Sequence, residues 1–185
     1  MTEKEFTQMK VHRLVLDPNS NSPIVILQDE ATGVLLPIWI GIFEAHSIAM
    51  KMEGIEAPRP LTHDLFSNTI ETLNGVVERV EVVDLVDNTY FARIHLLLKD
   101  ELYLLDSRPS DAIALALRLT SPIFVANHVL EHSKIDPEDF KISGEEEGEE
   151  GAESASGESS GEGDEDEYMR ILKNFNPNPD KDKYN

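Results

Sequence analysis

The stretch VVERVEVVDLVDNTYFARIHLLLKDELYLLD (residues 76–106) decides the fold, because it contains three β-strand patterns in succession. The pairs Asp87-Asn88 and Lys99-Asp100 separate these patterns, and connections this tight favour antiparallel hairpins. Three runs rich in β-branched and aromatic residues are the expected strands: Val76–Asp84, Thr89–Leu98 and Glu101–Asp106. The stretch therefore predicts an antiparallel meander.

The residues before this meander begin with further strand patterns and continue with two helical ones. Turn-forming residues separate three β-rich runs: Met9–Asp17, Pro23–Gln28 and Gly33–Ile40. The helices are expected at Ile42–Glu53 and at His63–Leu73, the second with Thr62 as its N-cap. The periodicity of the second helix predicts that it buries five side chains: Leu65, Phe66, Thr69, Ile70 and Leu73.

The residues after the meander complete the domain. A third helix is expected at Pro109–Leu119, where proline suits the first helical position. A short strand at Ile123–Val125 and a helical turn near His128–His132 follow. Runs of strands with helices inserted between them predict an α+β fold, with a mixed, largely antiparallel sheet of about six to seven strands and three main helices.

Charge divides the chain into three parts. Residues 144–167 hold ten Glu and two Asp with no Lys or Arg, and almost no apolar side chains, so we expect a disordered acidic linker. Residues 168–185 form a short tail whose apolar side chains at Tyr168, Ile171, Leu172 and Phe175 have helical spacing, as in a docking helix. Residues 1–143 are the expected folded domain, and their net charge of −10 opposes loose binding to a nucleic-acid backbone.

The composition excludes several classes of site and protein. The chain has no cysteine, which excludes disulfides and thiolate metal sites. No apolar run is long enough to span a membrane, and no signal-peptide pattern opens the sequence, so a cytoplasmic protein is expected. Exposed sheet edges in so small a domain need covering, and a homodimer is the simplest homo-oligomer that covers them.

Three segments concentrate polar groups at the starts of expected helices: Gly41–His46, Arg59–Asp64 and Asp106–Asp111. Unpaired backbone N–H groups and the positive end of a helix favour anions at such places. They suit phosphate, and carboxylates gathered nearby could hold Mg²⁺ or Mn²⁺ for phosphodiester hydrolysis. No organic cofactor is indicated.

Each of these residues also has a purely structural interpretation. Asp64 and Asp111 lie in first helical turns, where an acidic residue stabilises the helix dipole by itself. Arg108 and Asp111 are three residues apart and have the spacing of an ion pair within one helix. The spacing alone leaves both interpretations open.

The histidines and the tryptophan are less informative. His46 is expected on a solvated helix face, and His128 and His132 are expected to be solvent-exposed because no carboxylate completes a metal set beside them. Trp39 lies between two isoleucines in a strand, which favours a place in the core or an interface over a base-stacking surface.

The three polar segments also carry a family resemblance. LPIWIGIFEAHSIA (residues 36–49), PRPLTHDL (residues 58–65) and SRPSDAIALALR (residues 107–118) resemble, in order and spacing, the bifunctional nuclease domain family. The resemblance covers roughly Met9 to Asp136 and implies a nuclease that acts on RNA, DNA or both.

The resemblance also indicates site residues. The family's polar positions fall on eight residues: Glu44, Arg59, Thr62, His63, Asp64, Arg108, Ser110 and Asp111. We expect Glu44, Asp64 and Asp111 to supply metal-binding or general-base carboxylates and His63 to protonate the leaving oxygen. Arg59 and Arg108 are expected to hold the phosphate, with Thr62 and Ser110 beside them.

Two functions therefore stand side by side. The first is a nuclease that hydrolyses phosphodiester bonds with a divalent cation. The second is a non-catalytic oligomeric module that binds a small anionic ligand or a protein partner. Carboxylates within reach of one metal ion would favour the nuclease, whereas arginines buried in ion pairs would favour the module.

Overall fold

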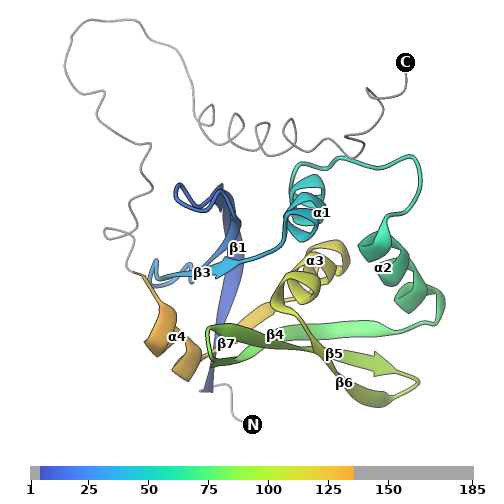
Figure 1. Ribbon diagram of the computed structural model, residues 1–185. Coiled ribbons are helices and arrows are strands. Elements are labelled where there is room, and N and C mark those ends of the chain that lie inside the picture. The colour runs from blue at the N-terminus through green and yellow to red at the C-terminus, as the bar shows by residue number, and fades with distance from the viewer. Residues whose placement is uncertain (1–4, 136–185) are drawn as a thin grey trace, which may run out of the picture. The chain divides into compact units, whose positions relative to one another are not determined.

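The computed structural model describes residues 5–135 and arranges them as one mixed sheet with four helices (Figure 1). The strands are β1 (Phe6–Leu16), β2 (Pro23–Gln28), β3 (Leu35–Trp39), β4 (Val76–Val86), β5 (Thr89–Leu98), β6 (Glu101–Ser107) and β7 (Ile123–Ala126). The helices are α1 (Ile42–Met52), α2 (Thr62–Thr72), α3 (Pro109–Leu119) and α4 (Asn127–Ser133). The α+β prediction is confirmed, and the predicted acidic linker and C-terminal tail lie outside the described residues.

The sheet has the strand order β3-β2-β1-β7-β4-β5-β6, and β1 joins its two halves. The first part of β1, Phe6–Met9, pairs with β7, and its later part, Lys10–Leu16, pairs with β2. The pair β4 and β7 is parallel, and every other pair in this sheet is antiparallel. The predicted meander is confirmed as β4-β5-β6.

The hairpin turns of the meander have the backbone that their sequence favours. Asp87 and Asn88 have φ of 49° and 60°, and Lys99 and Asp100 have φ of 52° and 62°. Positive φ at both central residues is the type I′ geometry, whose twist matches that of the flanking strands.

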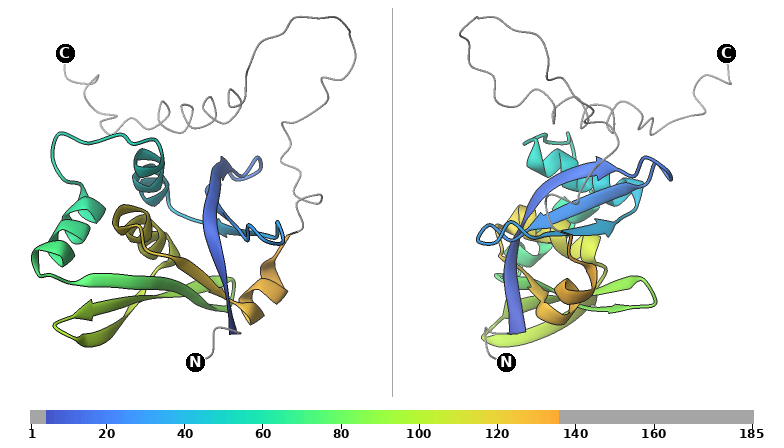
Figure 2. Two further views of the ribbon diagram at one scale, coloured as in Figure 1. Left: turned by 180° about the vertical axis from the view of Figure 1, so that it is seen from behind. Right: turned by 90° about the vertical axis from the view of Figure 1, so that its left-hand side faces the viewer.

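Helix α3 is the centre of the core. Seven of its residues are buried, among them Ile113 and Leu115, because α3 packs against β4 and β5 and also against α1 and α2. Figure 2 shows the three helices on one face of the sheet, with α4 at the opposite end of the strands. The first turns of α1, α2 and α3 thereby come within reach of one another.

The prediction for the buried face of α2 is confirmed for Ile70 and wrong for the other four side chains. Leu65 is 60% exposed and Leu73 is 55% exposed, and only Ser67 and Ile70 of this helix are buried. The helix turns a partly polar stripe of His63, Ser67 and Ile70 toward α3, since these residues recur at i, i+4 and i+7. The apolar periodicity failed here because polar contacts with α1 and α3, described below, orient the helix.

Three smaller predictions, for Thr62, Trp39 and His46, are also corrected in whole or in part. Thr62 is the first residue of α2 and not its N-cap: Leu61 holds that position, and its N–H donates to Asp64 Oδ2 at 2.9 Å. Trp39 is 52% exposed at the end of β3, so the core is wrong as its place, while a place in an interface stays a prediction. His46 is partly buried, and this burial lowers its pKa, whereas His128 and His132 are exposed as predicted.

A buried charged group lies on β4 and β5. Glu81 is 3% exposed, with Arg79 Nε 2.7 Å from one carboxylate oxygen and His95 Nε2 2.8 Å from the other. Burial alone would raise the pKa of Glu81, but the hydrogen bonds from Arg79 and His95 outweigh it, and the pKa lies below its ordinary value.

No helix among residues 5–135 has the length and apolar character needed to cross a membrane.

Candidate active site

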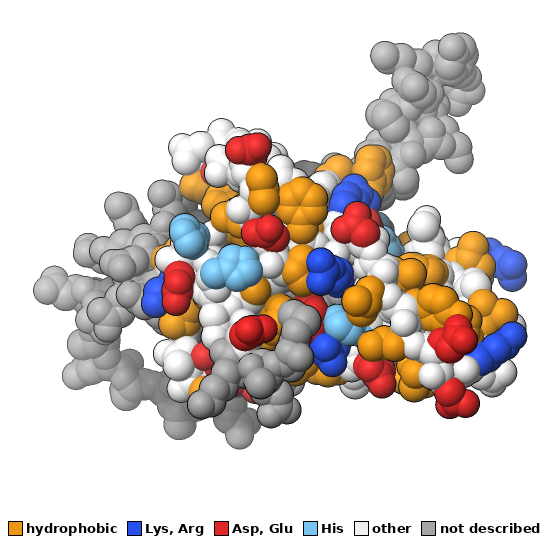
Figure 3. All heavy atoms as spheres, turned by 90° about the horizontal axis from the view of Figure 1, so that it is seen from below, with side chains coloured by type: hydrophobic (Ala, Val, Ile, Leu, Met, Phe, Trp, Pro, Cys, Tyr) orange, Lys and Arg blue, Asp and Glu red, His pale blue; other side chains and the backbone are white. Residues whose placement is uncertain are grey.

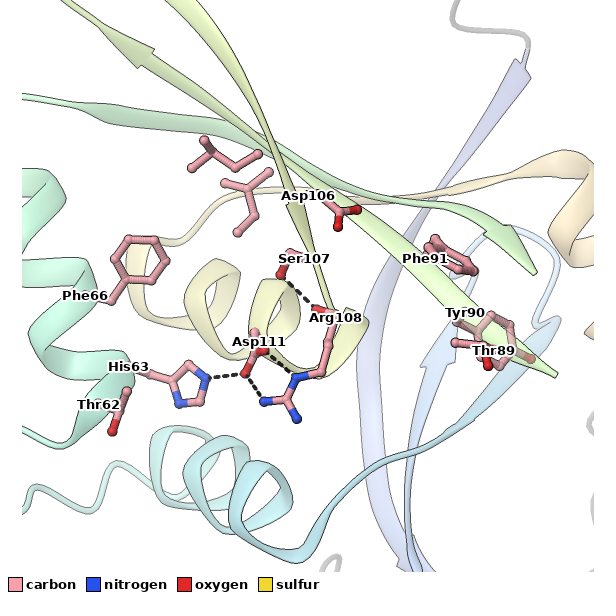
Figure 4. Close-up of a pocket in the computed structure, with 12 residues that line it drawn as sticks. Thr62, His63, Phe66, Thr89, Tyr90, Phe91, Asp106, Ser107, Arg108 and Asp111 are labelled. Atoms are coloured by element: carbon pink, nitrogen blue, oxygen red, sulfur yellow. Dashed lines mark hydrogen bonds and ion pairs between the residues drawn. The ribbon is translucent and has the colours of Figure 1, made fainter. Parts of the chain in front are cut away.

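The first turns of three helices meet around the guanidinium of Arg108. This residue is the N-cap of α3, where the chain leaves β6 in an extended conformation. Its Nη2 lies 2.8 Å from Glu44 Oε1 on α1, and its Nε and Nη2 lie 2.7 and 3.0 Å from the two carboxylate oxygens of Asp111 on α3. The family resemblance implied these three residues, and the structure brings them into direct contact; Figure 4 shows the part of this contact between Arg108 and Asp111.

Arg108 combines this anchoring with exposure. The hydrogen bonds to Asp111 and the charges of Asp111 and Glu44 raise the pKa of Arg108 above its ordinary value. Its side chain is nevertheless 65% exposed, and Nη1 takes part in none of its described contacts. The guanidinium is therefore fixed on one side and presents a hydrogen-bond donor to solvent on the other.

His63 lies between α1 and α3 with both ring nitrogens engaged. Its Nε2 is 3.0 Å from Asp111 Oδ1, and its Nδ1 is 2.9 Å from Ser47 Oγ. A carboxylate can only accept, so Nε2 carries a hydrogen and donates to Asp111. When the ring is neutral, Nδ1 is the acceptor and the Ser47 hydroxyl donates to it. His63 is thereby fixed in orientation.

Asp111 receives donors from two directions. Burial of this carboxylate alone would raise its pKa, but the hydrogen bonds from Arg108 and His63 outweigh that effect, and the pKa lies below its ordinary value. The charged form is therefore the one that the site stabilises, and Asp111 holds Arg108 and His63 together.

A second arginine supports the site from within. Arg118 on α3 is 6% exposed; its Nε lies 2.6 Å from Asp64 Oδ1, and its Nη2 lies 3.0 Å from Ser47 Oγ. Burial raises the pKa of Asp64, but the hydrogen bonds from Arg118 and from the Leu61 N–H lower it by more, so that it lies below its ordinary value. Asp64 thus belongs to the same chain of contacts as His63, although Arg118 and Ser47 separate the two side chains.

Two cavities open beside this network. The larger has a volume of about 700 Å³ and lies between α2, the ends of β5 and β6, and the start of α3. The smaller, of about 380 Å³, lies between the end of β3, the β4-β5 turn and the start of α3. Thr89, Tyr90 and Arg108 line both cavities. Arg108 therefore stands at the border between them.

Only some of the eight predicted site residues are in contact with one another. Glu44, His63, Arg108 and Asp111 are joined directly, and Asp64 is joined through Arg118 and Ser47. Thr62 lines the larger cavity and Ser110 the smaller one. Arg59 is exposed on the connector before α2, and no described contact joins it to the others.

The three predicted metal ligands are not arranged as one set. Within residues 5–135, no three His, Asp or Glu side chains gather closely enough to hold a metal ion. Asp64 is paired with Arg118, and the cation between Glu44 and Asp111 is the guanidinium of Arg108. As arranged, these residues do not form a metal site with three protein ligands.

Sequence reasoning missed two residues of the network, Ser47 and Arg118. Ser47 follows Glu44 by three residues on α1, and Arg118 follows Asp111 by seven residues on α3. These spacings place each on the same helix face as a predicted site residue. A search for polar residues at such spacings from Glu44 and Asp111 would have found both.

Comparison with known proteins gives one family and several relatives. Residues 25–138 match the model of the bifunctional nuclease domain. An uncharacterized protein of Mycobacterium tuberculosis is 38% identical over 123 residues, which are 66% of this chain and 73% of the relative. "Bifunctional nuclease 2" of Arabidopsis thaliana is 30% identical over 112 residues, or 59% of this chain and 34% of the relative. "Bifunctional nuclease 1" of Oryza sativa subsp. japonica is 27% identical over 116 residues, or 61% of this chain and 35% of the relative.

Proposed function

Because this chain belongs to the bifunctional nuclease domain family, we propose that it hydrolyses phosphodiester bonds in RNA, in DNA or in both. One observation carries the proposal: an exposed guanidinium, fixed by two carboxylates, stands where two cavities meet. A phosphodiester placed there meets a positive charge and a free N–H donor, with carboxylates and an imidazole beside them.

In this proposal Arg108 binds the phosphate. Its Nη1 donates to a non-bridging oxygen, and its charge stabilises the negative charge that builds up on the phosphoryl oxygens in the transition state. The N-terminus of α3 adds the positive end of a helix dipole at the same place. Asp111 and Glu44 keep the guanidinium from turning away.

Glu44 serves as the general base. Its Oε1 accepts from Arg108, and its Oε2 lies against Gly41, a residue that lines the smaller cavity. A water molecule at Oε2 loses its proton to Glu44 as it attacks phosphorus. The P–O bond to the leaving nucleoside then breaks and leaves a phosphate monoester.

His63, as the imidazolium, supplies the proton for the leaving oxygen from Nε2 and becomes a neutral imidazole. It lines the larger cavity, and its Nε2–H points to Asp111 in the absence of substrate. Donation to the leaving oxygen requires Nε2 to exchange Asp111 for that oxygen, while Ser47 keeps the ring in place through Nδ1. Asp64 and Arg118 then act as positioning residues, since in the described contacts Arg118 reaches His63 through Ser47 and Asp64 is held by Arg118.

Metal assistance is a separate part of the proposal. A divalent cation would have to replace the guanidinium of Arg108 between Glu44 and Asp111, with substrate oxygens and water as its other ligands, a set that suits Mg²⁺. Such an ion would supply Lewis-acid stabilisation of the phosphoryl oxygens. The steps assigned above to Arg108, Glu44 and His63 do not depend on it.

The test is cleavage of labelled single-stranded RNA and DNA by the full-length chain, with Mg²⁺, Mn²⁺ or EDTA. The variant Asp111→Asn removes the charge that holds Arg108 and His63, so we expect cleavage to fall by roughly 100-fold or more while the fold persists. Asp106→Asn, an exposed residue of the same cavity, is the matched control and should retain activity. Cleavage that is equal in the wild type and in Asp111→Asn would contradict the proposed site.

The second candidate, a non-catalytic module that binds a small anion or a protein partner, has one observation in its favour. Asp64 and Asp111 are both held by arginines, and no described group of ligands is ready for a metal. If the protein binds nucleotides but cleaves no strand with Mg²⁺, with Mn²⁺ or in EDTA, the result would support this module over the nuclease.

A further inference from the structure

Arg108 and Tyr90 line both cavities, so the larger and the smaller one adjoin at the proposed phosphate site. A phosphodiester always connects two nucleosides, one on each side of the phosphorus. Cavities on both sides of a phosphate-binding arginine therefore have the layout that two successive nucleotides require.

The smaller cavity has an aromatic wall. Trp39 is 52% exposed there, although exposure of so large an apolar surface to water is unfavourable. Its indole Nε1–H donates to Asp17 Oδ2 at 3.0 Å, which satisfies the polar atom and holds the ring in place. Tyr90 lines the same cavity, and its hydroxyl donates to the Pro37 carbonyl at 3.3 Å. Two anchored aromatic rings thus border this space.

Polar groups complete the lining of the smaller cavity. Ser22, Asn88 and Thr89 contribute hydroxyl and amide groups, each of which can donate and accept hydrogen bonds. An aromatic wall with a few polar groups is the usual lining of a site for a flat, polar ring. Among the described residues that line the two cavities, Arg108 is the only lysine or arginine. The site thus has a place for one phosphate, with apolar surface beside it.

The larger cavity repeats this pattern on the other side of Arg108. Phe66 is 40% exposed and Phe91 is 41% exposed, and Ile94 and Leu105 add apolar surface. The partial exposure of Phe66, which sequence periodicity placed in the core, leaves its ring available to a ligand. Figure 4 shows Phe66 on the α2 side of this cavity, with Tyr90 and Phe91 on the opposite side.

We propose that the smaller cavity is a nucleobase subsite, in which a base stacks on Trp39 while the adjoining phosphate is bound by Arg108 and the next nucleoside enters the larger cavity. The inference rests on the proposed nuclease function and makes a dinucleotide the shortest ligand that fills the site. Stacking on an aromatic side chain is insensitive to base identity, because every base has a π face. The subsite therefore requires a base but does not select among bases.

Trp39 is the only tryptophan of the chain, so its fluorescence reports directly on the smaller cavity. The full-length protein is titrated with a dinucleotide that has a phosphorothioate bridge, with the same backbone lacking both bases, and with inorganic phosphate. We expect saturable quenching with the dinucleotide and none with the abasic backbone or with phosphate. Equal quenching by the abasic backbone would overturn the proposal.

Calorimetry with the same dinucleotide tests Trp39 itself. Trp39→Ala should weaken binding by about 5- to 150-fold, which corresponds to the loss of one stacked base. Trp39→Phe loses the bond to Asp17 but keeps a ring, and it should retain most of the affinity. Phe43→Ala, an exposed aromatic residue that lines neither cavity, is the matched control and should bind as the wild type does. Unchanged affinity in Trp39→Ala would also overturn the subsite.

These results separate the subsite from the nuclease. If the chain cleaves abasic and base-bearing strands equally well, the nuclease is supported and the subsite is wrong. If base-dependent quenching occurs but no strand is ever cleaved, the subsite is supported and the nuclease is wrong.

Discussion

His63 and Asp111 are 48 residues apart in the chain, and their side chains meet at 3.0 Å between Nε2 and Oδ1. This contact joins the first turn of α2 to the first turn of α3. It also connects the exposed half of the site, around Arg108, with its buried half, around Arg118. The two halves of the site and the sheet that supports them lead to five predictions.

Arg108→Lys tests the phosphate-binding guanidinium. Lysine keeps the charge but cannot bridge two carboxylates and a phosphate at once, because it lacks the planar fork of donors. We expect kcat/KM for labelled RNA to fall by roughly 100- to 1,000-fold. The urea midpoint should stay unchanged, because the side chain is 65% exposed. Arg93→Lys, on the exposed surface of β5, is the control. A variant with full activity would show that Arg108 does not bind the phosphate.

Gly41→Ala tests the position of Glu44. A Cβ at residue 41 would collide with Glu44 Oε2, the far end of a flexible side chain, so the carboxylate has to move away from Arg108. Activity should drop without loss of stability, because the φ of −72° suits alanine and the stiffer unfolded chain offsets the poorer N-cap. In a double-mutant cycle with Glu44→Gln, the second substitution should add little. Fully additive losses would refute a shared mechanism.

Arg118→Met tests the buried support. Methionine fills a similar volume, but Asp64 and the Ser47 hydroxyl lose their charged donor. We expect the free energy of unfolding, measured in urea, to fall by about 1.5–3 kcal/mol, which is the usual contribution of hydrogen bonds to a charged group. Activity should also fall, because His63 depends on Ser47 for its orientation. Arg118→Lys should recover part of the stability. A methionine variant as stable as the wild type would contradict the supporting role.

Stability should depend on pH in the acidic range. Asp64, Glu81 and Asp111 all have a pKa below the ordinary value of 3.8 for aspartate or 4.5 for glutamate. Each contributes stability that is fully present above its unfolded pKa and is lost as the pH falls through its folded pKa. These three carboxylates should therefore make the free energy of unfolding decrease as the pH falls below about 4.5. Glu81→Gln and Asp111→Asn should each reduce this slope.

A homodimer through the edge strand β6 is the fifth prediction. Leu102 is 52% exposed and Leu104 is 55% exposed on this strand, which is the last in the sheet order. Figure 3 shows hydrophobic side chains gathered over this end of the sheet. Light scattering should give twice the chain mass of 20.8 kDa, and Leu104→Lys should give the monomer. A wild-type protein that stays monomeric at all concentrations would contradict this prediction.

The sequence predicted the elements that follow local rules. The bounds of β2, β5 and α3 agree with those expected, because turn residues and Pro109 mark them unambiguously. The contacts of the site were beyond sequence reasoning, since Ser47 meets Arg118 across 71 residues and Asp64 meets it across 54. Pairings at that separation depend on how α1 and α2 pack on α3, which no local pattern encodes.

The orientation of α2 is the clearest case. Its leucines predicted a buried apolar stripe, yet the helix buries Ser67 and turns His63 toward Asp111. A few polar contacts here outweigh the apolar periodicity, and departures of this kind are expected at functional sites. The exposure of Phe66 is a consequence of the same rotation.

The divided pairing of β1 has a consequence for how the chain folds. Its first residues hydrogen-bond to β7, and the Thr7 hydroxyl contacts Asn127 across 120 residues of sequence. During synthesis, β1 therefore cannot pair with β7 until almost the whole domain has been made. Contacts so distant in sequence slow folding.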